Sequence, residues 1–289
     1  MTVINKYPNQ TKKRNKEFFK RKDQELTNLD WAKWAGWFDT DGCFTKQWNK
    51  QRKCYQLFVD LRLSDRQPVE LFSDIFETSL RYSEADTVTP NGSHYVAKQF
   101  RAVLSGPKAT WFTENVSPYL IKRAKREYAG RLLDDTVRSK DFNTWTRNEL
   151  THYLATVIEG DGGIQVLSAL TGNSKSCIMT ISSNDKHYLA SLVSISASRL
   201  NIISRFKKIN RSYETKRGTI NMYRLYLQCS RRNTENLDFL KSLLQYNVMT
   251  LDRKKEKVQE FLTWMALNYK PDLKIESSSS RICNLDEFK

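Results

Sequence analysis

The sequence predicts an α+β fold made of two pseudo-symmetric halves, each with the element order αββαββα and its own antiparallel sheet. Two repeated segments support this prediction. The acidic segment at 34–42, WAGWFDTDG, recurs as LATVIEGDG at 154–162, and the segment at 125–133 recurs in weaker form at 254–262. Between these anchors both halves run through the same order of predicted strands and helices. A repeat of this length indicates two like domains in one chain.

In the first half, the apolar residues after the acidic segment alternate as in a half-buried strand. Leu57, Val59 and Leu61 fall on one face of the extended chain. Helical spacing and the Pro-Asn-Gly turn at 90–92 then predict a helix, a hairpin and two closing helices. The predicted elements are strands at 43–48 and 55–63, a helix at 67–76, strands at 80–88 and 94–104, and helices at 109–116 and 122–137.

The second half repeats this order, with a hairpin around the Lys-Arg-Gly turn at 216–218. Its predicted elements are strands at 163–169 and 176–182, a helix at 185–200, strands at 204–213 and 219–229, and helices at 234–244 and 253–267. The predicted organisation is a basic N-terminal extension at 1–28, a first repeat at 29–137, a charged and polar linker at 138–148, a second repeat at 149–268 and a C-terminal tail at 269–289.

The helix predicted at each acidic segment carries small or polar residues at positions i, i+3, i+4 and i+7, which form one stripe and begin two residues before the segment. Small residues in such a stripe let two helix backbones approach closely, while the bulky residues between them face each half's own core. We therefore expect the two helices to pack against each other. The stripes are Ala32, Ala35, Gly36 and Asp39 in the first segment, and His152, Ala155, Thr156 and Glu159 in the second.

Both helices are predicted to end at a glycine, Gly42 or Gly162, in the left-handed conformation that follows a helix C-cap. Asp41 and Asp161 then lie at helix C-termini, where the helix dipole and their mutual repulsion both disfavour negative charge. A divalent cation such as Mg²⁺ offsets this, because it takes oxygen ligands and needs only one or two carboxylates. One Asp-Gly pair alone is typical of an ordinary turn, but its recurrence after matching stripes favours a paired site.

Composition restricts the function further. Lys and Arg total 48 against 32 Asp and Glu, and the formal net charge of +16 favours a polyanionic partner such as nucleic acid over a merely basic surface. The five scattered cysteines form no CxxC pair, which argues against a zinc module. A calcium loop is excluded because Lys50 stands where it needs a bidentate glutamate. No membrane span or transit peptide is expected.

WAGWFDTDG and LATVIEGDG each agree with LAGLIDADG at five of nine positions. Over 29–268 the chain resembles the LAGLIDADG homing endonuclease family, in the single-chain form that carries two motifs. The resemblance implies a saddle of two antiparallel sheets across the DNA major groove and metal-dependent phosphodiester hydrolysis of both strands at a specific site, leaving short 3′ overhangs. It also implies a double-stranded DNA partner, a monomer and, from the family alone, a place in a mitochondrion or chloroplast.

The resemblance also assigns site residues. Asp41 and Asp161, with backbone carbonyls near Thr40 and Gly160, would bind about two or three Mg²⁺ ions, or Mn²⁺ in their place. The family places a basic residue after a segment like the one at 118–121, PYLI, and an ordinary solvated helix face explains the basic run there about as well. The second half lacks this proline. The basic candidates are Lys122 and Arg123 in the first half, and Arg253 and Lys254 in the second.

Two further sets of residues follow from the resemblance. The polar position after the second strand of each repeat falls near Asp65 and Ser183. DNA specificity is expected from polar residues that alternate along the strands, although a register error of one residue would move them to the opposite, helix-covered face. These residues are Lys46, Trp48, Gln56, Arg62, Lys98, Arg101, Gln165, Lys175, Arg205, Lys207, Arg224 and Gln228.

Two other functions remain open from the sequence. One is a maturase that binds intron RNA, because a basic saddle also suits RNA. The other is a DNA-binding protein that has kept the packed helices without catalysis. Both motif aspartates are present, which favours cleavage over either alternative.

Overall fold

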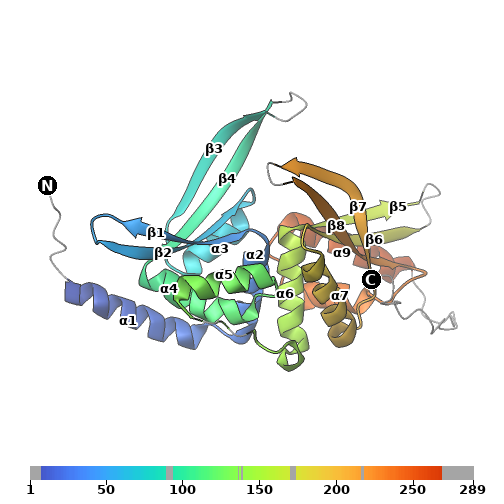
Figure 1. The fold of residues 1–289 in the computed structure, drawn as a ribbon. Helices are drawn as coiled ribbons and strands as arrows, with labels where there is room; N and C mark the ends of the chain where they lie inside the picture. The colour runs from blue at the N-terminus through green and yellow to red at the C-terminus, as the bar shows by residue number, and fades with distance from the viewer. Residues whose placement is uncertain are drawn as a thin grey trace.

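The computed structural model describes residues 8–88, 94–135, 137, 139–169, 174–215 and 218–268. Within these ranges the chain forms two halves, each with a four-stranded antiparallel sheet and helices against one face of it (Figure 1). In each sheet the first strand pairs with the second, the second with the fourth and the fourth with the third, so the sheets share one topology. The predicted α+β fold of two like repeats is therefore confirmed.

The first half follows the predicted order of elements. It contains helix α2 (Asn28–Thr40), strands β1 (Gly42–Asn49) and β2 (Cys54–Leu63), helix α3 (Arg66–Ile75), strands β3 (Leu80–Val88) and β4 (His94–Ser105), helix α4 (Pro107–Val116), the short 3₁₀ helix η1 (Ser117–Tyr119) and helix α5 (Arg123–Leu133). Helix α5 ends before the predicted residue 137 because Asp134 adopts a left-handed conformation with φ of 56°.

The second half repeats the arrangement. After the short helix η2 (Phe142–Thr144) come helix α6 (Arg147–Gly160), strands β5 (Gly162–Ser168) and β6 (Lys175–Ser183), helix α7 (Lys186–Leu200), strands β7 (Ser204–Thr215) and β8 (Gly218–Ser230), and helices α8 (Leu237–Gln245) and α9 (Asp252–Asn268). In Figure 1 the β3–β4 and β7–β8 hairpins extend to the same side of the molecule, so the two sheets form the flanks of the expected saddle.

The bulky residues of the motif helices fill each half's own core, as expected. In the first half, Trp34 contacts Phe72 with ring centroids 5.2 Å apart, and Phe38 contacts Phe112 at 4.8 Å. All four side chains are fully or almost fully buried. The aromatic residues of this half therefore stabilise the helix layer beneath the sheet.

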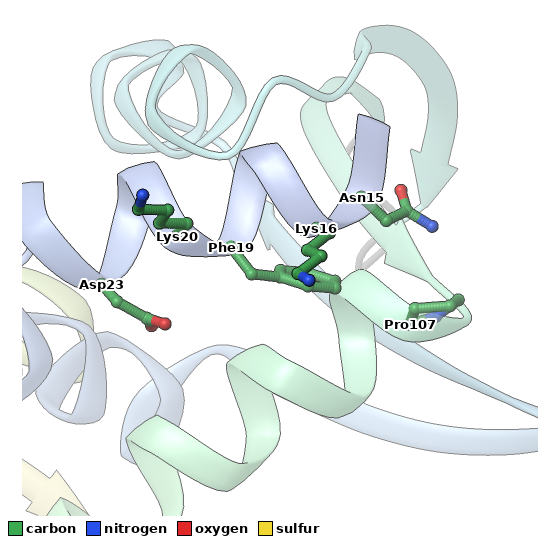
Figure 2. A pocket seen from close by; sticks show the side chains of 6 residues that line it. All are labelled: Asn15, Lys16, Phe19, Lys20, Asp23 and Pro107. Atoms are coloured by element: carbon green, nitrogen blue, oxygen red, sulfur yellow. The ribbon is translucent and has the colours of Figure 1, made fainter. Parts of the chain in front are cut away.

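Part of the predicted N-terminal extension is a helix, α1 (Pro8–Glu25), which was not predicted from the sequence. It packs on α4 through Phe18 and Phe19, whose rings lie 5.8 and 5.7 Å from that of Trp111. The indole of Trp111 also donates a hydrogen bond of 2.9 Å to Asp23. Figure 2 shows the α1 side chains, with Pro107, that line a pocket beside this contact.

The predicted linker at 138–148 is packed where the structure describes it. The indole of Trp145 is fully buried and lies 5.3 Å from the ring of Tyr119 and 5.8 Å from that of Tyr153. Lys140 forms an ion pair of 2.7 Å with Glu149. This connection therefore contacts both halves. The predicted tail at 269–289 lies outside the described residues, and none of the described helices combines the length and apolar character of a membrane span.

Candidate active site between the two halves

The two motif helices, α2 and α6, pack directly against each other, as the small-residue stripes predicted. Gly36 is the closest point, because a Cβ there would lie 2.0 Å from Thr156 Oγ1 and 2.6 Å from the Tyr153 carbonyl oxygen. The Thr156 hydroxyl donates a hydrogen bond of 3.0 Å to the carbonyl of Lys33 on the opposite helix. A threonine in one helix thus fits the space left by a glycine in the other.

The close packing brings the two motif aspartates together. Asp41 and Asp161 are the C-cap residues of α2 and α6. A Cβ on Gly160, next to Asp161, would lie 2.7 Å from Asp41 Oδ2. Burial raises the pKa of both carboxyl groups, and the charge of Asp161 raises the pKa of Asp41 further. The predicted pair of disfavoured anions is therefore present in the structure.

The predicted reason for the two motif glycines is wrong. Gly106 is the only described glycine with positive φ, so Gly42 and Gly162 are not left-handed caps. They begin strands β1 and β5, where the chain turns sharply against its own helix. A Cβ on Gly42 would lie 2.3 Å from the Phe38 ring, and one on Gly162 would lie 2.5 Å from the carbonyl oxygen of Ile158. These glycines are needed for close approach.

A lysine from the last helix of each half lies against the end of each motif helix. Lys125 of α5 donates to the carbonyls of Phe38, Thr40 and Gly42, the last two at 3.2 and 2.9 Å. Lys254 of α9 donates in the same way to three carbonyls at the end of α6: those of Ile158, Glu159 and Gly162. Burial lowers the pKa of each lysine to about 8.

These lysines are pseudo-symmetric, and each ammonium group sits at the negative end of a helix dipole beside the aspartates. Lys254 was predicted. Lys125 was missed, although the repeated segments at 125–133 and 254–262 align the two residues. Lys125 rather than Arg123 is thus the counterpart of Lys254. Arg123 is exposed and pairs with Glu127 at 2.6 Å, so the structure places it away from the aspartates.

The first acid of each motif anchors the segment that leads into this lysine. Asp39 accepts hydrogen bonds from the backbone N–H groups of Ile121 and Lys122, at 2.8 and 3.1 Å. Glu159 accepts from those of Thr250 and Leu251, at 2.6 and 2.5 Å. Burial raises the pKa of Glu159 to about 7. Both acids therefore have a structural role in holding α5 and α9.

The two halves differ at the residue just before these helices. Lys122 Nζ lies 3.9 Å from Asp161 Oδ2 and 4.9 Å from the centroid of the Tyr188 ring, so it reaches across to the second half. Its counterpart is Leu251, which is buried. Of the predicted basic candidates, Lys122 and Lys254 thus lie at the aspartates. The site has one more cation on one side than on the other.

Arg253 makes a different contact across the two halves. It forms a bidentate ion pair with Asp65, with Nε and Nη2 at 3.1 and 2.7 Å from the carboxylate oxygens. Ser183, predicted as the counterpart of Asp65, is buried and accepts a hydrogen bond from the backbone N–H of Asp185. Neither Arg253 nor Ser183 is placed among the groups around Asp41 and Asp161.

The donor set between the helices suits a hard divalent cation. Asp41 Oδ2 is buried and has no hydrogen-bond partner among the described residues, so it is a free anionic ligand atom. Asp161 supplies a second carboxylate. The described residues contain no group of three or more His, Cys, Asp or Glu side chains placed to hold a metal ion by themselves, and Mg²⁺ needs only one or two carboxylates when water and phosphate oxygens complete its shell.

The strand register shows which predicted DNA-contacting residues share the open face of the sheets. On each sheet the apolar partners, such as Phe44 with Val59 and Ile164 with Met179, point toward the helices. Residues of the other parity point away from the helices. Eight predicted residues lie on this open face: Gln56, Arg62, Arg101, Gln165, Arg205, Lys207, Arg224 and Gln228.

The predicted face is wrong for the other four residues. Lys46 and Trp48 share the parity of Phe44, and Lys46 pairs with Asp134 of the α5 C-cap at 3.1 Å. Lys175 pairs with Glu260 of α9 at 2.6 Å. Lys98 shares the face of Phe100 and Ala102. Trp48 and Lys98 are exposed although they are on the helix side, whereas Lys46 and Lys175 are half-buried beside the helix residues with which they pair.

No protein-family model and no curated protein matches the sequence. Among solved structures, the chain is similar to the LAGLIDADG meganuclease I-AabMI bound to uncleaved DNA, with 15% identity over 84% of this chain and 91% of that one and a TM-score of 0.49. It is also similar to the DNA complexes of the homing endonucleases I-GzeII and I-WcaI. Each has 13% identity and a TM-score of 0.45, over 84% and 83% of this chain and 90% and 91% of theirs.

Proposed function

We propose that this chain is a DNA endonuclease of the LAGLIDADG homing type, which hydrolyses both strands of a specific duplex at the Asp41–Asp161 pair. The observation that carries the proposal is this pair: two half-buried carboxylates at the touching ends of two helices, with Lys125 and Lys254 beside them. A structural ion pair would place the lysine ammonium on the carboxylate. Here Lys125 and Lys254 bind helix carbonyls instead, and Asp41 Oδ2 keeps no partner among the described residues.

Asp41 and Asp161 would hold divalent cations, Mg²⁺ or Mn²⁺, with backbone carbonyls near Thr40 and Gly160. When bound, such a cation activates water and stabilises the leaving oxygen of a phosphodiester. The chain's own groups contribute charge. Lys125 and Lys254, which donate to backbone carbonyls at the ends of α2 and α6, place positive charge beside a phosphate. Lys122 adds a third cation on the Asp161 side.

Double-stranded DNA is the substrate that suits the rest of the molecule. The net charge of +16 favours a polyanion, and the open faces of both sheets carry the eight polar residues described above. Strands can enter the major groove and present side chains to base edges. The two halves together supply both aspartates from one chain, so we propose that the protein acts as a monomer on an asymmetric site.

The proposal is tested by incubating the full chain with a plasmid library of randomised inserts in Mg²⁺ and sequencing the linear products. The expected result is one long preferred site cut in both strands with short 3′ overhangs, and no cutting in a metal chelator. Site-specific binding without cutting would make the chain a silent DNA-binding protein. Binding of structured intron RNA in preference to any duplex would favour the maturase alternative. Either result overturns the nuclease proposal.

A further inference from the structure

Three arginines lie side by side across the open face of the first sheet. The register pairs Arg62 of β2 with Arg101 of β4, and Arg101 with Arg81 of β3. We call these three residues the arginine row. Directly opposed like charges destabilise a sheet, so this arrangement has a cost in the free protein. Arg81 was not among the predicted DNA-contacting residues. It is exposed, and its side chain makes no hydrogen bond or ion pair with another described residue.

One carboxylate binds two of the three arginines. The buried Asp60 accepts from Arg101 Nε at 3.0 and 2.9 Å and lies 2.8 Å from Arg101 Nη2. It also accepts from Arg62 Nη2 at 3.1 Å. Asp60 therefore engages the side edge of the Arg101 guanidinium, and the Nη1 end remains free to point away from the sheet. Two positive charges of the row stay uncompensated.

The row starts at the catalytic pair. Gly42, next to Asp41, pairs with Leu61, so Arg62 is level with Asp41. The second sheet has the equivalent arrangement beside Asp161. The Ser182 N–H donates to the Asp161 carbonyl at 3.3 Å, and Ser182 is paired across the strands with Arg224, which is paired in turn with Lys207. Ser182 accepts from Arg224 Nε at 2.9 Å. A basic row therefore flanks each aspartate, with three arginines on one side and one on the other.

We propose that the arginine row reads guanines in the major groove next to the cleavage position, and that Asp60 is a positioning residue which holds Arg101 for this contact. The inference rests on the proposed function. A guanidinium fork matches the O6 and N7 acceptors of guanine, and a carboxylate behind it fixes its orientation. Strands lie about 4.8 Å apart, so the row spans about 10 Å, the length of about three base pairs.

The asymmetry of the two rows makes the expected target asymmetric. The half-site under β2, β4 and β3 carries guanines at neighbouring positions close to the cut. The half-site under the second sheet has a weaker guanine preference, because Ser182 and Lys207 replace two of the arginines. A Lys ammonium is a point charge without the paired donors of Arg, so it discriminates less between bases.

The test is selection of cleaved duplexes from a randomised library by the full chain and two variants. Arg101→Gln is expected to change the preferred base from guanine to adenine at one position near the cut, because a glutamine amide matches adenine N6 and N7. The ratio of kcat/KM for the two bases should shift by about 5- to 150-fold. Lys98→Gln, on the same strand but the helix side, is the control and should leave every base preference unchanged.

Asp60→Asn tests the positioning role. It should flatten the base preference at the Arg101 position while preferences elsewhere in the site stay sharp, and Asp60→Glu should restore part of the guanine preference. A merely structural Asp60 would lower activity on all duplexes alike, which would contradict the positioning role.

The outcomes separate the two proposals. If the wild-type chain cuts a specific site without guanine at these positions, or if Arg101→Gln weakens all duplexes equally, the row contacts phosphates and this inference is overturned. If the wild-type chain cuts no site, the proposed function itself is overturned, and the reading of the row with it.

Discussion

At the scale of single residues, the motif aspartates were predictable because they occupy matching places in two repeated segments. Lys125 was not predicted, because the resemblance places the basic residue directly after the segment at 118–121. Only the fold shows that Lys122 and Lys125 have different roles: Lys122 reaches the other half, while Lys125 binds the end of its own motif helix. Both roles depend on contacts between elements far apart in the sequence.

The first prediction concerns the aspartates. Asp41→Asn or Asp161→Asn should lower double-strand cleavage by about a hundredfold or more, because an amide cannot replace the anionic ligand of a divalent cation. Binding to the same duplex should stay equal or become tighter, since each change removes a negative charge near the DNA phosphates. Cleavage time courses and gel-shift titrations measure the two effects. Cleavage near the wild-type rate in either variant would mean that the site is misassigned.

The second prediction concerns Lys122, which has no basic counterpart in the second half. Lys122→Met removes the cation that lies 3.9 Å from Asp161 Oδ2, whereas Leu251 offers nothing equivalent on the other side. The variant should therefore slow one strand cut more than the other, and nicked circles should accumulate from a supercoiled target plasmid. Lys98→Met is the matched control for loss of charge. Equal slowing of both strands would show that Lys122 serves the whole site.

At the scale of elements, strands and core-facing helices were predictable to within a few residues, since their apolar periodicity comes from burial on one face. Helix α1 was not, because its contact with α4 is made by two adjacent aromatic residues in an otherwise charged segment. The side of the sheet on which Lys98 lies was also not predicted. Both faces are exposed where the hairpins extend beyond the helices, so burial no longer marks parity there.

The third prediction tests the packing of α2 on α6. Gly36→Ala should lower the free energy of unfolding by about 2 kcal/mol or more, because the new methyl group meets the Tyr153 backbone carbonyl as well as Thr156 Oγ1. Gly163→Ala is the control, since its nearest neighbour is Thr180 Oγ1 at 3.3 Å. Urea unfolding of both variants measures the difference. Equal stability of the two would contradict the close approach of these helices.

The fourth prediction uses a cysteine pair in the second sheet. Cys177 and Cys229 are opposite each other on β6 and β8, and burial raises the pKa of each thiol to about 12. Only the thiolate reacts with alkylating agents, so at pH 8 these residues should resist iodoacetamide in the folded chain. The exposed Cys43 and Cys54 should react. Peptide mapping by mass spectrometry before and after unfolding in urea tests this.

At the scale of the whole molecule, the fold class and the paired centre could be predicted from the repeats, but the relation between the halves could not. Periodicity describes one element at a time. The position of each basic row beside a motif aspartate depends on strand register, and the contact of Lys122 with Asp161 depends on packing across the interface. The asymmetry of the site is therefore a property of the assembled halves.

The fifth prediction follows from the total charge. Binding to the preferred duplex should weaken steeply with salt, because each neutralised phosphate contributes about −0.9 to the slope of log K against log salt concentration. With about six to ten phosphates contacted, affinity should fall about a thousandfold or more between about 50 and 200 mM salt. Fluorescence anisotropy over a salt series gives the slope. A flat dependence would count against a DNA partner.

The fit of Thr156 into the notch at Gly36 also restricts which repeats can be combined. A chimera with two copies of the second half would set one Thr156 against another, with no glycine to receive either side chain. A different first half could be exchanged for this one only if it offered a glycine at the position of Gly36. The interface therefore favours the pairing of these two unlike halves, and a change at Gly36 or at Thr156 requires a compensating change at the other residue.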